Sequence, residues 1–182
     1  NMNMARVLSR LETLSHSLSQ REEHALVGAP SLHAGQLRGG SAPSVYAAEC
    51  RLRMERRTVP GESAEEALDD VQAILDALSE ADADFEAEAA IAFAREPLET
   101  PADASIATTV RESLSRVLND EPAPDTGASF WTDAALLTEA GTETIVLGPK
   151  GAGLHTTEEW VDLASVAQLA EVLVHTARRY CA

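Results

Sequence analysis

Hydrophobic residues in the first half of the chain follow two different periods. A spacing of three and four residues from Met4 to Leu18 predicts an amphipathic helix over about 3–19. Alternation of apolar and polar residues then predicts strands, each with one buried face, over 31–38, 45–57 and 85–93. The last of these ends before Pro97, which marks a change in the character of the chain.

A second helix is predicted between the last two of these strands. Ser63 and Glu66 have the spacing of a capping box, in which each residue satisfies a backbone N–H group of the other. The apolar stripe that follows is Leu68, Val71, Ile74, Leu75 and Leu78. Helix, strand, strand, helix and strand is the order of a split βαβ, ferredoxin-like sandwich without its opening strand.

The second half has the pattern of an α/β layer. A helix is expected from Ile106 to Leu118, followed by a loop rich in proline and glycine over 119–127. Helices over 133–140, capped by Thr132 and stopped by Gly141, and over 163–180 enclose a buried strand at 144–147 and a glycine-rich loop. A ligand of such a layer would sit at the carboxyl end of the strand.

Composition restricts the partners of the protein. The 182 residues include 14 basic and 30 acidic side chains, and the net charge of −16 repels nucleic acid and anionic membranes. No signal peptide or membrane-spanning run is visible, and Cys50 and Cys181 cannot form a disulfide framework. We therefore expect a cytoplasmic protein. Because a helical pattern is already running at Met4, we also expect the chain to be part of a longer protein.

Candidate chemistry centres on one histidine. Residues 127–131 lack the second glycine of a serine nucleophile elbow, and no G-K-[ST] phosphate loop occurs. The other four, His16, His24, His33 and His175, lie on predicted helix surfaces or in loop and strand contexts, where a histidine is more often a solvated side chain than a ligand. His155 follows a strand and a glycine-rich loop, and it has Glu158 and Glu159 nearby. The spacing leaves two alternatives open, a metal ligand or an ordinary loop histidine.

Two ordered motifs resemble one enzyme family. The segments "RGGSAPSVYAAECRLRMERRTVPGESAEEAL" and "GASFWTDAALLTEAGTETIVLGPKGAGLHTTEEWVDL" closely resemble the lid and the C-terminal catalytic segment of one group of zinc metallopeptidases. This is the family of acetylornithine deacetylase, succinyl-diaminopimelate desuccinylase, aminoacylase and glutamate carboxypeptidase. The resemblance implies an α/β fold, with an α+β lid over 1–97 and the C-terminal part of a doubly wound catalytic domain over 98–182.

The resemblance also implies roles for particular residues. His155 matches the C-terminal metal ligand, and Arg57 matches the lid arginine that binds the carboxylate of the substrate. Ser44 stands where the family usually has asparagine, and Ala47 stands where it has proline. The glycine turn that includes Gly151 and Gly153 resembles the loop beside the substrate. Asp133 and Glu159 are expected to support the site structurally.

Most of the expected metal site does not occur in this sequence. The family places an H-x-D element, a bridging aspartate, a Glu-Glu pair with the general base and a further acidic ligand ahead of the lid. No histidine here is followed two residues later by aspartate. One imidazole cannot hold the two zinc ions of the family, so we expect this chain alone to be inactive.

The leading hypothesis is therefore part of a zinc-dependent amidohydrolase or peptidase that cleaves N-acyl amino acids or small peptides. The resemblance also predicts a homodimer formed through the lid. The alternative is a non-enzymatic module that uses the lid for dimerisation or binding.

Overall fold

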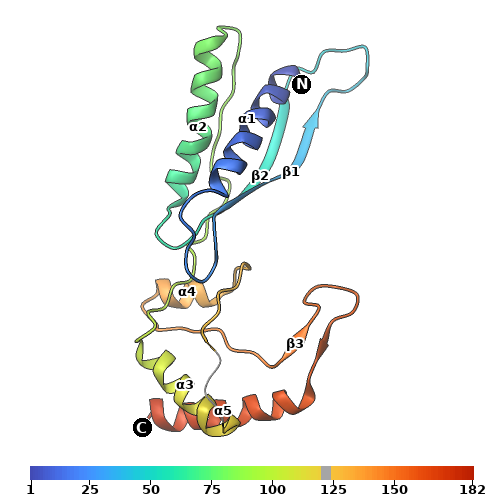
Figure 1. The fold of residues 1–182 in the computed structure, drawn as a ribbon. Coiled ribbons are helices and arrows are strands. Elements are labelled where there is room, and N and C mark those ends of the chain that lie inside the picture. Colours follow the sequence, from blue (N-terminus) through green and yellow to red (C-terminus); the bar gives the residue numbers. More distant parts are fainter. Residues whose placement is uncertain (120–123) are drawn as a thin grey trace. The chain divides into compact units, whose positions relative to one another are not determined.

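The computed structural model describes residues 1–119 and 124–182, which divide into two compact units (Figure 1). Unit 1 contains Asn1–Pro97 together with Gly127–Ser129, and unit 2 contains Leu98–Thr126 and Phe130–Ala182. The protein is of the α/β class. Part of the loop predicted over 119–127 lies outside the described residues.

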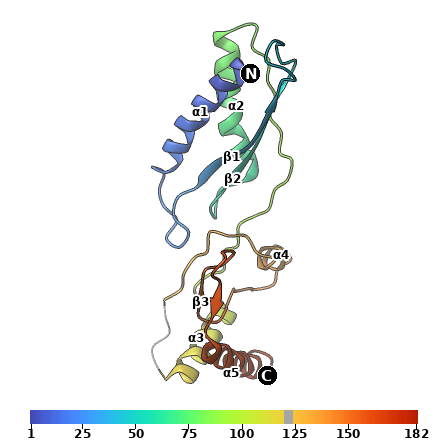
Figure 2. The same ribbon diagram turned by 90° about the vertical axis from the view of Figure 1, so that its right-hand side faces the viewer.

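Unit 1 packs two helices against a two-stranded antiparallel sheet. Helices α1 (Met2–Leu18) and α2 (Ala64–Ala81) lie side by side on one face of strands β1 (Ser31–Gly39) and β2 (Cys50–Arg57) (Figures 1 and 2). Its core consists of Val7, Leu11, Leu75, Leu78 and Phe85, with Leu32, Leu52 and Met54 of the sheet packed against them. The two expected helices are confirmed.

The start of α2 confirms the predicted capping box. The hydroxyl of Ser63 accepts from the backbone N–H of Glu66 at 3.1 Å, and the Glu66 carboxylate accepts from the N–H of Ser63 at 2.8 Å. Both bonds satisfy donors that the first turn of a helix leaves without an internal partner. The spacing of Ser63 and Glu66 in the sequence was therefore sufficient to predict where α2 begins.

The strands of unit 1 differ from the prediction in two respects. Strand β2 begins at Cys50 and not at residue 45, because residues 40–49 form the loop that joins it to β1. The strand predicted over 85–93 is not formed, although Phe85 is buried in the core. In a split βαβ sandwich the closing strand pairs with the opening one, and the described residues offer this segment no such neighbour.

Unit 2 is built on two packed helices, α3 (Ser105–Leu118) and α5 (Leu163–Tyr180). A short helix, α4 (Ala134–Glu139), precedes a small hairpin of β3 (Gly151–Ala152) and β4 (Trp160–Val161), which leads directly into α5 (Figure 1). The strand predicted over 144–147 is wrong: Ile145 and Leu147 are half-buried, but the described residues provide no adjacent strand for their backbone.

Helix α4 ends as its glycine predicts. Gly141 has a φ of +86°, and its N–H donates to the carbonyl of Thr138 at 2.9 Å. The N–H of Thr142 donates to the carbonyl of Leu137 at 2.9 Å, which completes a Schellman motif. At the other end, the Thr132 hydroxyl accepts from the N–H of Ala134 at 3.3 Å.

Candidate functional site

His155 lies at the tip of the β3–β4 hairpin. Gly151 pairs with Val161 and Ala152 pairs with Trp160, so the seven residues 153–159 form the loop that the hairpin closes. His155 has a φ of +61°, in the left-handed region that non-glycine residues seldom adopt. Its side chain is exposed. The hairpin therefore presents an imidazole to its surroundings from a defined backbone position.

The hairpin is fixed by hydrogen bonds at its tip and its base. At the tip, the backbone N–H and the hydroxyl of Thr156 both donate to the carbonyl of Gly153, at 2.9 and 2.8 Å. At the base, the N–H of Asp162 donates to the carbonyl of Lys150 at 2.8 Å, and the N–H of Lys150 donates to Ser165 Oγ at 2.9 Å. These bonds attach the hairpin to the first turn of α5.

The geometry of the hairpin requires glycine at two positions, Gly151 and Gly153. A Cβ on Gly151 would come 2.5 Å from the carbonyl oxygen of Trp160, and one on Gly153 would clash with the carbonyl of Glu158. Gly153 also has a φ of +78°. Close approach of two backbones therefore requires glycine at both positions. Their expected contact with substrate remains a prediction.

The carboxylates expected to support the site lie at element ends. Asp162 caps α5, because its Oδ1 accepts from the N–H of Ala164 at 2.9 Å. Glu159 is exposed beside β4, and Asp133 occupies the N-cap position of α4 without a side-chain capping bond. Asp162 was not predicted from the sequence, although its position one residue before the apolar stripe is a usual signal of an N-cap.

The described residues do not form a metal site by themselves. Across 1–119 and 124–182, no three side chains of histidine, cysteine, aspartate or glutamate are grouped so that they could hold an ion. An exposed imidazole such as that of His155 suits one coordination position of zinc, which needs three or four protein ligands. A complete site would need ligands from residues other than those described.

Arg57 is the last residue of β2 and lies on the exposed face of the strand. Its Nε is 2.6 Å from Glu55 Oε1, and its Nη1 donates to the carbonyl oxygen of Ser129 at 3.0 Å. Ser129 belongs to the short segment 127–129 that forms part of unit 1. Two neighbours thus orient the guanidinium, while about half of the side chain remains exposed.

Ser44 lies far from Arg57 within unit 1. It is exposed in the loop joining β1 to β2, next to the pair formed by Gly39 and Cys50. Arg57 pairs with Ser31 at the opposite end of the hairpin. At about 3.3 Å per residue, the strand alone separates the two ends by more than about 20 Å. The structure therefore does not bring these two predicted contacts together in one copy of the chain.

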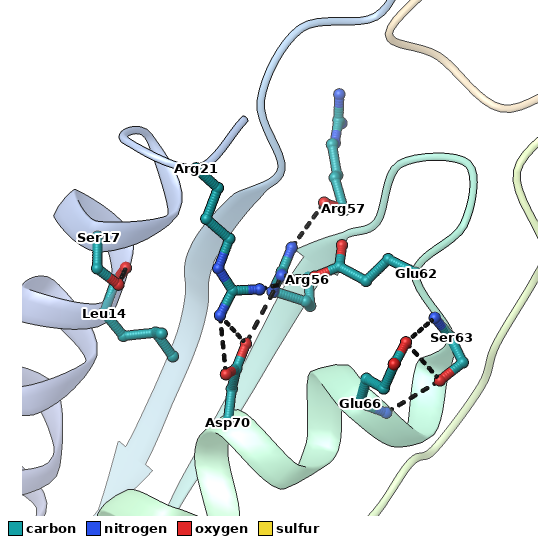
Figure 3. A network of polar contacts seen from close by, with 9 residues as sticks. All are labelled: Leu14, Ser17, Arg21, Arg56, Arg57, Glu62, Ser63, Glu66 and Asp70. Atoms are coloured by element: carbon teal, nitrogen blue, oxygen red, sulfur yellow. Dashed lines mark hydrogen bonds and ion pairs between the residues drawn. The ribbon is translucent and has the colours of Figure 1, made fainter. Parts of the chain in front are cut away.

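A partly buried ion cluster lies beside Arg57 and was not predicted from the sequence. Arg56 and Glu62 form an ion pair, and their side chains are only 8% and 12% exposed. Arg21 donates to Glu62 at 3.0 Å and to both carboxylate oxygens of Asp70 at 2.9 Å (Figure 3). The available signal was the strand alternation, which continues past Met54 and places Arg56 on the buried face of β2.

Comparison with known proteins identifies the class of this α/β chain. The model of peptidase family M20/M25/M40 matches residues 11–179. The chain therefore belongs to this peptidase family, a family of metallopeptidases and deacylases, as the two sequence motifs predicted.

Two individual proteins are similar to this chain. The chain is 28% identical over 179 residues to acetylornithine deacetylase of Myxococcus xanthus, covering 97% of this chain and 45% of that protein. It also resembles the crystal structure of the M20 family metallo-carboxypeptidase Sso-CP2 from Sulfolobus solfataricus, with a TM-score of 0.54 and 17% identity. That match covers 91% of this chain and 40% of the carboxypeptidase, and shows the shared fold. The chain thus spans less than half the length of either protein.

Among the helices of residues 1–119 and 124–182, none combines the length and the apolar character needed to cross a bilayer.

Proposed function

We propose that this chain is the lid and C-terminal catalytic segment of a zinc-dependent amidohydrolase that cleaves N-acyl amino acids or small peptides. Family membership over residues 11–179 supports a hydrolase of the metallopeptidase and deacylase type. The similarity to an acetylornithine deacetylase over 97% of this chain supports the N-acyl amino acid as substrate class. In this proposal, residues 1–97 form the lid and dimerisation domain, and residues 98–182 belong to the catalytic domain.

The observation that carries the proposal is the presentation of His155. A hairpin fixed to α5 holds an exposed imidazole at its tip, at the position that matches the metal ligand of the family motif. The left-handed backbone position of His155 also supports the proposal, because uncommon backbone conformations cluster at functional sites. In the complete enzyme we expect His155 to be one ligand, and zinc to supply the activation of a water molecule.

Arg57 would bind and orient the substrate. A planar guanidinium forms paired hydrogen bonds with a carboxylate, which a single ammonium group cannot match geometrically. Glu55 and the Ser129 carbonyl already hold its Nε and Nη1 in place, so the group is ordered before substrate arrives. Ser44, Gly151 and Gly153 remain proposed contacts, and the general base would come from residues outside this chain.

Exposed apolar side chains support the view that unit 2 is completed by further polypeptide. On α5, Leu163 is 78% exposed, and Leu173 and Val174 are each about half exposed. Large apolar residues such as these often face a core or a partner surface. We propose that the rest of the catalytic domain covers this face in the complete, cytoplasmic protein.

The test is hydrolysis by two proteins, the 182-residue chain and the product of the complete reading frame. With added zinc, the complete protein should release acetate from N-acetyl amino acids, and the chain alone should not. The substrate in this test must carry a free carboxylate, because Arg57 is proposed to bind that group. A complete protein that hydrolyses neither N-acetyl amino acids nor dipeptides would refute the proposed activity.

A non-enzymatic dimerisation module remains the second candidate. The observation that favours it is that unit 1 has its own core, formed by α1, α2 and the sheet. Dimers in sedimentation are expected under both proposals, so the reading frame distinguishes them: one with no H-x-D element ahead of the lid would favour the module. A monomer at high concentration would contradict the dimer in both.

A further inference from the structure

Four charged side chains from four parts of unit 1 meet in one cluster. Arg21 follows α1, Arg56 ends the buried face of β2, Glu62 follows a turn, and Asp70 lies on α2. Arg56 Nη2 pairs with Glu62 and lies 3.8 Å from Asp70 Oδ2. Arg21 contacts both carboxylates. We call these four residues the ion cluster (Figure 3).

The ion cluster is unlike an arrangement that serves mainly to stabilise the fold, because of the free energy lost when charges leave water. Burying charges costs several kcal/mol per ion, and their attraction offsets this only when the remaining donors and acceptors are satisfied. Here Arg56 Nε and Glu62 Oε2 are buried without a hydrogen-bond partner among residues 1–119 and 124–182. Apolar side chains at these positions could pack against Met54 and the helices at no such cost. A geometric role therefore explains the cluster better than stability does.

The turn between β2 and α2 delivers Glu62 to this position. The N–H of Glu62 donates to the carbonyl of Val59 at 3.0 Å, and Gly61 has a φ of +89°. With Pro60 and Gly61 as its central residues, this is the arrangement of a type II turn. The segment that leaves Arg57 thus folds back, and its carboxylate pairs with the residue that precedes Arg57.

The ion cluster also holds the backbone of Arg57. Arg56 Nη1 donates to the carbonyl oxygen of Arg57 at 2.8 Å, and Figure 3 shows the Arg57 side chain extending away from the cluster. This bond fixes the peptide plane that follows Arg57, and thereby the direction in which its side chain leaves the strand. The guanidinium of Arg56 is itself held by Glu62, and Glu62 and Asp70 are held by Arg21.

We propose that the ion cluster is a positioning device that sets the direction of the Arg57 side chain for binding the substrate carboxylate. The proposal rests on the proposed function of Arg57. Glu62, Asp70 and Arg21 act through Arg56 and touch no substrate. Two positioning residues, Glu62 and Asp70, can be changed without altering side-chain size.

The kinetic test uses Glu62→Gln and the milder Asp70→Asn in the complete protein. For an N-acetyl amino acid, each should raise KM about five- to tenfold while kcat changes less than about twofold, because a binding contact is misdirected. The matched control is Asp82→Asn, which breaks the 2.6 Å ion pair with Arg6 at the far end of α2 and leaves Arg57 untouched. The control should leave KM unchanged.

Two comparisons separate positioning from a general loss of structure. In an Arg57→Ala background, Glu62→Gln should raise KM no further, since the side chain that it positions is gone. With the corresponding amino acid amide, which offers no carboxylate, neither cluster variant should change KM. An equal increase for acid and amide, or an additive effect in the double variant, would overturn the proposal.

A measurement without activity tests the geometry in the 182-residue chain itself. The Nε–H signal of Arg57 in nuclear magnetic resonance reports its bond to Glu55. It should shift toward the solvent value in Glu62→Gln and Asp70→Asn, but not in Asp82→Asn. An unchanged signal in both cluster variants would refute positioning. If the signal shifts but the complete protein hydrolyses no N-acyl amino acid, the proposed function fails and the geometric role stands.

Discussion

Arg57 Nη1 donates a hydrogen bond to the carbonyl oxygen of Ser129 at 3.0 Å, which joins two residues 72 positions apart. The contact is possible because the chain packs against unit 1 at Gly127, two residues earlier. A Cβ at Gly127 would overlap the carbonyl group of Leu26. The absence of one side chain therefore allows a segment from the second half of the chain to order a side chain in the first half.

Gly127→Ala should release the 127–129 segment from unit 1. Because backbone atoms stand in the way of the new methyl group, the clash cannot be relieved by a side-chain rotation. We expect the free energy of unfolding to fall by about 1–3 kcal/mol, the usual cost of overpacking. Gly148→Ala is the matched control, since no atom in the described part of the chain lies within 4 Å of its Cβ position. Equal stabilities in urea unfolding would contradict the packing described here.

The capping box of α2 should make stability depend on pH. Hydrogen bonds from the backbone N–H and then the hydroxyl of Ser63 hold the pKa of the Glu66 carboxyl below its ordinary value of 4.5. A lowered folded-state pKa gives stability that is present above that ordinary value and is lost as pH falls through the lowered one. The free energy of unfolding should therefore decrease on acidification below about pH 4.5.

Glu66→Gln isolates this contribution. The variant should lose part of the acid dependence, because the amide does not ionise, whereas Glu65→Gln in the same helical turn should keep it. Urea unfolding at a series of pH values above and below about 4.5 measures the free energy of unfolding of both variants. If the two variants and the wild type have parallel profiles, the Ser63 bonds do not act on Glu66 as proposed.

The sequence pattern predicted helices and turns better than it predicted which strands pair with one another. The helix that starts at Ser63 and the turn at Gly141 depend on residues within four positions, so local chemistry was sufficient. The alternation over 85–93 correctly placed Phe85 toward the core, but it contains no information about which strand would pair with it. Extended segments need a neighbour for their backbone, and the neighbour is a property of the fold.

In the candidate site, too, local sequence predicted single residues but not their contacts with distant segments. The sequence located His155 after a glycine-rich turn, and the structure adds that the turn is a paired hairpin. Arg57 was found through its motif, but Ser129 as its acceptor depends on a contact between distant segments. Arg56 lies beside it at a buried position and could have been singled out, because a charge on the apolar face of a strand requires a partner.

The exposed apolar side chains of α5 should promote self-association of the 182-residue chain. Leu173→Glu is expected to reduce self-association and the binding of a hydrophobic dye by the chain alone, because it places a charge on that face. In the complete protein the same change should lower stability, since the charge would be buried without a partner. Gln168→Glu adds the same charge at an exposed polar position of α5 and should do neither. Light scattering and thermal unfolding measure the two effects.

His155→Asn tests the proposed metal ligand with little disturbance of the hairpin. Asparagine tolerates the left-handed region better than most residues, so the φ of +61° at this position should be preserved. In the complete protein we expect loss of bound zinc and a decrease in kcat/KM on the order of 100-fold or more, with thermal stability of the metal-free form unchanged. His16→Asn, at an exposed site near the end of α1, should retain both zinc and activity. Full zinc content and full activity in His155→Asn would show that the hairpin aims its imidazole at something other than the metal.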